Sequence, residues 1–85
     1  MIRKNYYNIS EVAELIGRDT SAIRFWETEF GDLHTKKNVH GNRQFRPIDV
    51  QRVIIINVLI NKGWTIPGAI EQMRELMFLP EQIFA

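Results

Sequence analysis

The pattern of apolar and polar residues near the start of the chain predicts a short helix. Its apolar stripe consists of Val12, Ala13, Leu15 and Ile16. Ser10 is a suitable N-cap, Glu11 places negative charge in the first turn, and Gly17 marks the end of the helix. The pattern therefore predicts a helix of about two turns.

A second helix is predicted directly after this turn, from Thr20 to about Glu29, with Asp19 as its cap. Its apolar face comprises Ala22, Ile23, Trp26 and Phe30. Its other face carries Thr20, Ser21, Arg24, Phe25 and Thr28. Two short helices joined by a short turn that contains glycine are typical of a helix-turn-helix, although many helical domains contain such a corner.

Between residues 31 and 46 the helical period disappears and an extended pattern replaces it. The residues that fit a strand are Leu33, Thr35 and Val39. Gly41-Asn42 is a turn signal, and Arg43-Gln44-Phe45 leads out of the turn. We expect a β-hairpin whose tip lies between Asn38 and Asn42.

The second half of the chain begins with a third predicted helix, over about residues 47–62. Pro47 suits its first position and Gly63 its end, although Arg46 is a poor N-cap. The β-branched run at residues 53–60 would also fit a strand. The polar residues of the opening turns favour a helix instead.

Thr65 caps a fourth predicted helix, from Ile66 to about Met77. Apolar residues continue beyond it, in residues 78–85, and the third helix is apolar almost all round. Three interpretations follow. The tail folds back over the third helix, or both form a patch that meets another subunit, or these residues simply complete a compact core. We therefore divide the chain into a domain at residues 1–77 and an apolar tail at 78–85, for packing or dimerisation.

Length and composition describe one small globular domain. The chain has 85 residues, of which 45% are apolar and 25% charged. The absence of cysteine excludes disulfides, cysteine-ligated zinc and a cysteine nucleophile. No apolar run approaches the roughly 18 residues that a membrane span needs. We expect a cytoplasmic protein without a membrane partner.

Candidate chemistry beyond binding is sparse in the sequence. His34 and His40 could hold a metal in principle, but without a nearby carboxylate they are interpreted as surface imidazoles. Glu27 and Glu29 are two residues apart on a helix and do not face one another, so they form no catalytic pair. The sequence predicts no cofactor, no metal site and no enzymatic activity.

The formal net charge of +1 conceals a basic stretch. No acidic residue lies between Asp32 and Asp49, and the four cations of that stretch are Lys36, Lys37, Arg43 and Arg46. From residue 47 onward, three basic and four acidic side chains give a local charge of −1. A basic hairpin beside a helix-turn-helix suits DNA, because cations attract phosphates and a helix can enter the major groove. A hairpin that is merely solvated is the alternative.

The order of these elements and several residues resemble the DNA-binding domain of the MerR family, a winged helix-turn-helix. The resemblance covers about residues 7–73. The matching segments are residues 9–17 in the first helix and turn, Ile23-Arg24-Phe25-Trp26-Glu27 in the second helix, Gly41-Asn42-Arg43-Gln44-Phe45 in the wing, Asp49-Val50, and Gly63-Trp64-Thr65-Ile66. The Trp-Glu-x-Glu-Phe variant at residues 26–30 resembles a subgroup of the family. The implied fold is mainly α, with four helices and a small β-hairpin wing.

The resemblance also implies a set of DNA-binding residues. Thr20, Ser21 and Arg24 would face the major groove, where Arg24 could bond a guanine edge or a phosphate. Phe25 would either cover the wing or touch the DNA backbone. The wing would supply the phosphate contacts of Lys36, Lys37, Asn42, Arg43 and Arg46.

This chain departs from the family pattern at three positions. Phe25 and Phe45 stand where the family often has tyrosine, so neither can donate a hydroxyl hydrogen bond to a phosphate. Arg18 occupies a position that is usually aliphatic. Family members usually continue into a long dimerisation helix and an effector domain. We therefore expect either a homodimer or a dimerisation segment that this sequence does not contain.

The sequence as a whole predicts a sequence-specific, double-stranded DNA-binding transcriptional regulator that works at the bacterial nucleoid. Two alternatives stay open. An architectural protein of the excisionase type would bend DNA and bind it as a cooperative array. A protein-interaction module would have lost DNA binding and would use its apolar C-terminal half to contact a partner.

Overall fold

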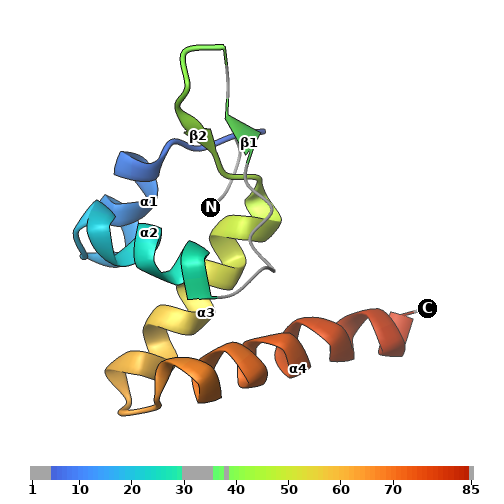
Figure 1. The fold of residues 1–85 in the computed structure, drawn as a ribbon. Helices are drawn as coiled ribbons and strands as arrows, with labels where there is room; N and C mark the ends of the chain where they lie inside the picture. The colour runs from blue at the N-terminus through green and yellow to red at the C-terminus, as the bar shows by residue number, and fades with distance from the viewer. Residues whose placement is uncertain (1–4, 30–35, 38, 85) are drawn as a thin grey trace.

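The computed structural model describes residues 5–29, 36–37 and 39–84, with the side chains of 36–37 and 78–84 left aside (Figure 1). Within this part of the chain the fold is mainly helical, as predicted, with four helices and one short hairpin. The elements are α1 (Ile9–Ile16), α2 (Thr20–Glu29), β1 (Lys36–Lys37), β2 (Arg43–Gln44), α3 (Pro47–Asn61) and α4 (Ile66–Phe84).

Helix α1 begins at Ile9 and is capped by Asn8, not by Ser10 as predicted. The Asn8 side chain accepts a hydrogen bond of 2.8 Å from the Glu11 amide, and Glu11 Oε1 accepts one of 3.0 Å from the Asn8 amide. This reciprocal pair satisfies two amides at once, which Ser10 could not do because no carboxylate follows it at the required spacing. Gly17 ends the helix with φ of 72°, a left-handed conformation that favours glycine.

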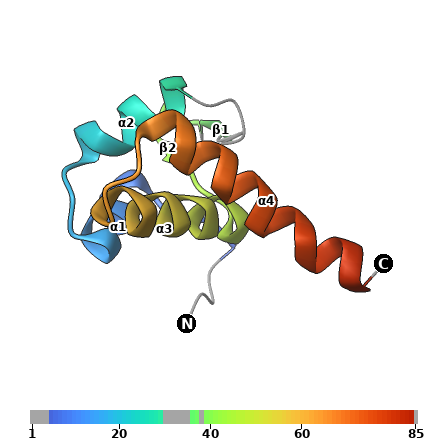
Figure 2. The same cartoon turned by 90° about the horizontal axis from the view of Figure 1, so that it is seen from below.

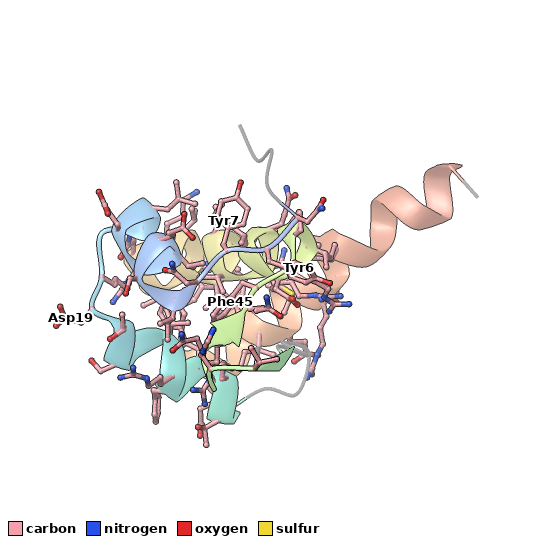
Figure 3. The ribbon with its side chains drawn as sticks, turned by 90° about the horizontal axis from the view of Figure 1, so that it is seen from above. Tyr6, Tyr7, Asp19 and Phe45 are labelled. Carbon is pink, nitrogen blue, oxygen red and sulfur yellow. The ribbon has the colours of Figure 1, made fainter. Side chains whose placement is uncertain are left out.

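Helix α2 has the predicted bounds, Thr20–Glu29, and lies across from α1 in a helix-turn-helix. Ile23 and Trp26 are buried, whereas Phe30 lies outside the described residues. The Asp19 side chain points away from the protein (Figure 3). The first turn is held instead by the Asp19 carbonyl, which accepts a hydrogen bond of 3.1 Å from the Ala22 amide.

Strands β1 and β2 form an antiparallel hairpin, called the wing below. Lys36 pairs with Gln44 and Lys37 with Arg43, so the tip lies between Lys37 and Arg43, in agreement with the prediction. Val39 lies in the turn and is 95% exposed, so its assignment to a strand was wrong. It lies in the chain between Lys37 and Arg43, which form the last described pair of the ladder. Leu33, Thr35 and His34 lie outside the described residues.

The base of the wing is joined to the N-terminal segment, which the sequence did not indicate. The Tyr7 amide donates to the Phe45 carbonyl at 2.8 Å, and the Phe45 amide donates to the Tyr7 carbonyl at 2.7 Å. Figure 3 shows Phe45 inside the protein and Tyr7 at its edge. Because the Phe45 side chain is fully buried, the wing is tied to the hydrophobic core at this point.

Helix α3 lies at the centre of the fold and is a helix throughout Pro47–Asn61, which rejects the strand alternative for residues 53–60. In Figures 1 and 2, α1, α2 and the wing lie on one side of α3 and α4 on another. The buried apolar side chains come from all of these elements: Val12, Ala13, Ile23, Trp26, Phe45, Val50, Val53, Ile56, Leu59, Ala69, Ile70 and Met73. A shared core therefore explains most of the apolar character of α3.

Helix α4 starts at Ile66 as predicted, with the Thr65 hydroxyl oxygen accepting from the Gly68 amide at 3.2 Å. It ends at Phe84, not near Met77, and continues past Pro80. The helix was predicted to end too early. Each residue added to an existing helix needs no new nucleation, so the helix can extend into the apolar tail. The backbone of residues 78–84 runs on in the direction of α4, away from the other elements, and does not fold back over α3 (Figures 1 and 2). No helix within the described residues is both long and apolar enough to cross a membrane.

Arg18, in the turn between α1 and α2, connects this turn to α3. Its Nε donates to Asn57 Oδ1, and its Nη2 donates to Asn61 Oδ1 at 2.7 Å. The guanidinium also lies 5.3 Å from the centre of the Trp26 ring. Asn57, which is buried, donates in turn to the Ile16 carbonyl at 3.4 Å. An aliphatic residue at position 18 could make none of these polar contacts.

Replacing Arg18 with methionine is expected to lower the free energy of unfolding by about 1–2 kcal/mol, because Asn57 and Asn61 lose a charged donor while the apolar stem remains. Urea unfolding measures the change. Arg24→Met is the matched control, since Arg24 is exposed on the neighbouring helix. A stability of Arg18→Met equal to that of the control would contradict this role for Arg18.

Candidate nucleic-acid interface

Helix α2 turns a polar face outward because its apolar face is buried. Ser21, Arg24 and Phe25 are exposed and Thr20 is half-buried, while Ile23 and Trp26 pack into the core on the opposite side. The structure therefore brings the four residues predicted on this helix to one accessible surface. Short hydroxyl side chains, a guanidinium and an aromatic ring together can form hydrogen bonds and apolar contacts.

The wing lies beside α2, and an ion pair joins the two. Arg43 Nε on β2 is 2.7 Å from Glu27 Oε1 on α2. The wing and α2 also share a cleft of about 290 Å³ with the start of α1. The cleft is lined by Asn8, Ile9, Ser10, Arg24, Gly41, Asn42 and Arg43. Two predicted site residues on separate elements, Arg24 and Arg43, thus line the same depression.

Glu27 is the residue of this surface that the sequence analysis missed. The sequence places it in the family signature at residues 23–27 and beside Glu29, but gives it no role in binding. A signal was nevertheless present, because Thr20, Arg24 and Glu27 are spaced i, i+4 and i+7 and so share one face of a helix. The spacing alone could not reveal its partner, which lies 16 residues further along the chain, at Arg43.

Arg46 lies at the base of the wing, where it contacts Asp49. Its Nε and Nη2 donate to the Asp49 carboxylate at 2.9 and 3.1 Å, and its amide donates at 3.0 Å. Asp49 is fully buried and also accepts from Arg52 at 3.4 Å. The hydrogen bonds that Arg46 donates to Asp49, and then the negative charge of Asp49, raise the pKa of Arg46 above its ordinary value. Because Asp49 accepts a hydrogen bond from the Arg46 amide, its side chain caps the first turn of α3. This explains how Arg46 can occupy the N-cap position although its own side chain is a poor cap.

The remaining predicted residues belong to the wing. Lys36 and Lys37 form β1, and Asn42 is exposed directly before β2. His40 is exposed in the turn. Within the described residues, no group of three or more histidine, cysteine, aspartate or glutamate side chains could hold a metal ion.

Comparison with known proteins identifies the family. A model of the MerR helix-turn-helix family of regulatory proteins matches residues 7–76, which is most of the chain. The chain belongs to the MerR family. The match begins at the segment that pairs with Phe45 and ends within α4, so it contains the helix-turn-helix, the wing and α3.

Solved structures of MerR regulators have the same fold. One is HiNmlR, a MerR family regulator that lacks the sensor domain and was crystallised bound to promoter DNA. The two chains are 23% identical with a TM-score of 0.71, over 86% of this chain and 55% of HiNmlR. A MerR family transcriptional regulator from Bacillus thuringiensis is 24% identical with a TM-score of 0.69, over 93% of this chain and 69% of that one. This chain thus spans about half the length of HiNmlR. No curated protein is significantly similar to it in sequence.

The buried carboxylate of Asp49 is expected to be the main polar support of this MerR wing at its base. Asp49→Asn keeps the size of the side chain but removes the charge that both arginines contact, so the free energy of unfolding should fall by about 2 kcal/mol. Urea unfolding tests this, with the exposed Asp19→Asn as the matched control. An Asp49→Asn variant as stable as the Asp19→Asn control would show that the charge is dispensable.

Proposed function

We propose that this protein is a sequence-specific, double-stranded DNA-binding regulator of transcription. One observation carries the proposal: in a MerR fold, the exposed polar face of α2 lies beside a basic wing. HiNmlR, which has the same fold, was crystallised on promoter DNA. A regulator of this kind works in the bacterial cytoplasm, at the nucleoid.

In this proposal α2 is the recognition helix and enters the major groove. Arg24 bonds a guanine edge, which presents two acceptors to a guanidinium. Thr20 and Ser21 precede it by four and three residues and lie on the same side of the helix. Their short hydroxyls contribute weaker base selectivity. Phe25 is half-exposed next to Arg24 and supplies an apolar contact with the sugar-phosphate backbone.

The wing supplies the contacts that depend on charge and not on base sequence. Lys36 and Lys37 bind phosphates, and Asn42 adds a neutral donor at the edge of the cleft shared with Arg24. Arg46 contributes positive charge at the base of the wing, where its contacts with Asp49 hold it. This arrangement gives a steep dependence of affinity on salt, because each neutralised phosphate releases counterions.

Replacing Arg24 with alanine is expected to weaken binding to the preferred DNA site by about 10–100-fold and to relax the sequence preference, because one bidentate base contact is worth about 1–3 kcal/mol. Selection of bound sequences from a random duplex pool, with the wild type and the variant, measures both effects. Lys37→Ala is the comparison, and should weaken binding evenly across sequences.

The same selection separates the classes of function. Enrichment of an inverted repeat supports a dimeric regulator. Enrichment of direct repeats supports an architectural array, and no enrichment by the wild type supports a protein-interaction module. Equal binding by wild type and Arg24→Ala would show that this face of α2 does not read DNA.

We propose further that two copies of the chain act together. A single module buries roughly 600–1,000 Å² on DNA, so two modules on one site increase affinity and specificity. Helix α4 runs past the other elements to Phe84, and its last turns are rich in apolar residues: Phe78, Leu79, Ile83 and Phe84. The apolar residues of such a helix are expected to be buried, and we propose that α4 of a second copy of the chain buries them.

Sedimentation equilibrium tests the dimer. The full chain is expected to sediment as a dimer, and Leu79→Glu with Ile83→Glu should give a folded monomer, because charge in the contact has no partner. Gln82→Glu adds a charge in the same turns and is the matched control. A monomeric wild type at micromolar concentration would contradict dimerisation through α4.

A further inference from the structure

The ion pair between Glu27 and Arg43 joins the two elements of the proposed DNA-binding surface. We propose that Glu27 is a positioning residue: through Arg43 it holds the wing at the distance and angle from α2 that lets both bind one DNA duplex. This inference rests on the proposed function. It also changes the role of Arg43 from a phosphate contact to the anchor of the wing.

The first argument concerns the wing itself. Within the described residues each of its strands contributes two residues to the ladder, and an isolated two-stranded ribbon is at best marginally stable in water. Its base is attached through Phe45 to the core and to Tyr7, and through Arg46 to Asp49. Attachment at the base alone leaves a ribbon free to tilt. Arg43 is two residues nearer the tip, so its contact with Glu27 supplies a second point and fixes the tilt.

The second argument concerns the environment of Glu27. Its side chain is only 11% exposed, whereas that of Arg43 is 34% exposed. A carboxylate so far removed from water needs a positive partner, and removing that partner leaves a costly buried charge. Arg43 therefore remains paired with Glu27 when a phosphate approaches, because breaking the ion pair would leave the Glu27 carboxylate buried and without a positive partner.

The third argument concerns charge on the recognition face. Thr20, Arg24 and Glu27 lie on one face of α2 by their spacing. An uncompensated carboxylate there would repel the DNA backbone. The ion pair with Arg43 neutralises this carboxylate and attaches the wing to α2. Arg24 and Arg43 line the same cleft between the two elements.

The two roles for Arg43 predict opposite results for Glu27→Gln. If Arg43 were a phosphate contact restrained by Glu27, removing the negative charge would strengthen DNA binding. If Glu27 positions the wing, the same change weakens DNA binding although it makes the protein more positive. It also lowers the salt dependence, because the phosphate contacts of β1 are lost with the wing's position.

The experiment measures affinity by fluorescence anisotropy between about 50 and 200 mM salt, on the duplex most enriched in the random-pool selection. Glu27→Gln is expected to bind roughly tenfold more weakly near 0.1 M salt, with a log–log salt slope smaller by about one. Arg43→Gln should give the same change. The double variant should bind no more weakly than either single variant, because the wing is already released.

Glu29→Gln is the matched control, since it makes the same change of charge on the exposed surface of the same helix. It should retain the wild-type salt slope. Tighter binding by Glu27→Gln with an unchanged or steeper slope, or additive effects in the double variant, would overturn the positioning role.

Amide hydrogen exchange without DNA keeps the inference separate from the proposed function. In Glu27→Gln the amides of the wing should exchange faster, while those of α3 keep their wild-type rates. If the wild type binds no duplex, the proposed function fails, and the exchange result alone decides the positioning role. Wild-type exchange in the wing of Glu27→Gln would refute it.

Discussion

Helix α3 is apolar around most of its circumference, and the need to cover most of its sides constrains the whole domain. Val50, Val53 and Ile56 are fully buried, and the elements that bury them are α1, α2, the wing base and α4. A domain of this size buries only roughly 60% of its unfolded surface, so it has no second core on which any element could rest. The recognition helix and the wing are therefore oriented by the same central helix.

Polar contacts fix the relative orientation of the elements around α3, which apolar packing alone does not specify. Arg18 bonds two asparagines of α3 and thereby fixes the turn of the helix-turn-helix. At the other end of α3, the Asp49 carboxylate accepts hydrogen bonds from both Arg46 and Arg52. Buried polar groups tolerate few alternative arrangements, because each loses free energy when its partner is absent. Both ends of α3 are thus tied to the segments that flank the proposed DNA surface.

The net charge of +1 has a different meaning once the ion pairs are known. The basic stretch contains four cations, but Arg43 contacts Glu27 and Arg46 contacts Asp49. These two arginines serve the architecture of the wing. The two lysines of β1 are then the residues of the stretch proposed to bind phosphates directly, while Arg46 adds positive charge at the base of the wing. The family relationship alone would not have separated the lysines from the arginines.

Local physics explains what the sequence by itself determined. Periodicity, glycines and proline located the two short helices, the tip of the wing and the start of α3, because each depends on residues close together in the chain. The predicted end of α4, near Met77, was wrong. The helix continues past Pro80 to Phe84, and no local signal in the sequence indicates this. Only the tertiary structure decided the partners of Tyr7, Arg18 and Glu27. Those partners lie far away in sequence, and their pairing depends on how the elements pack around α3, which no local pattern encodes.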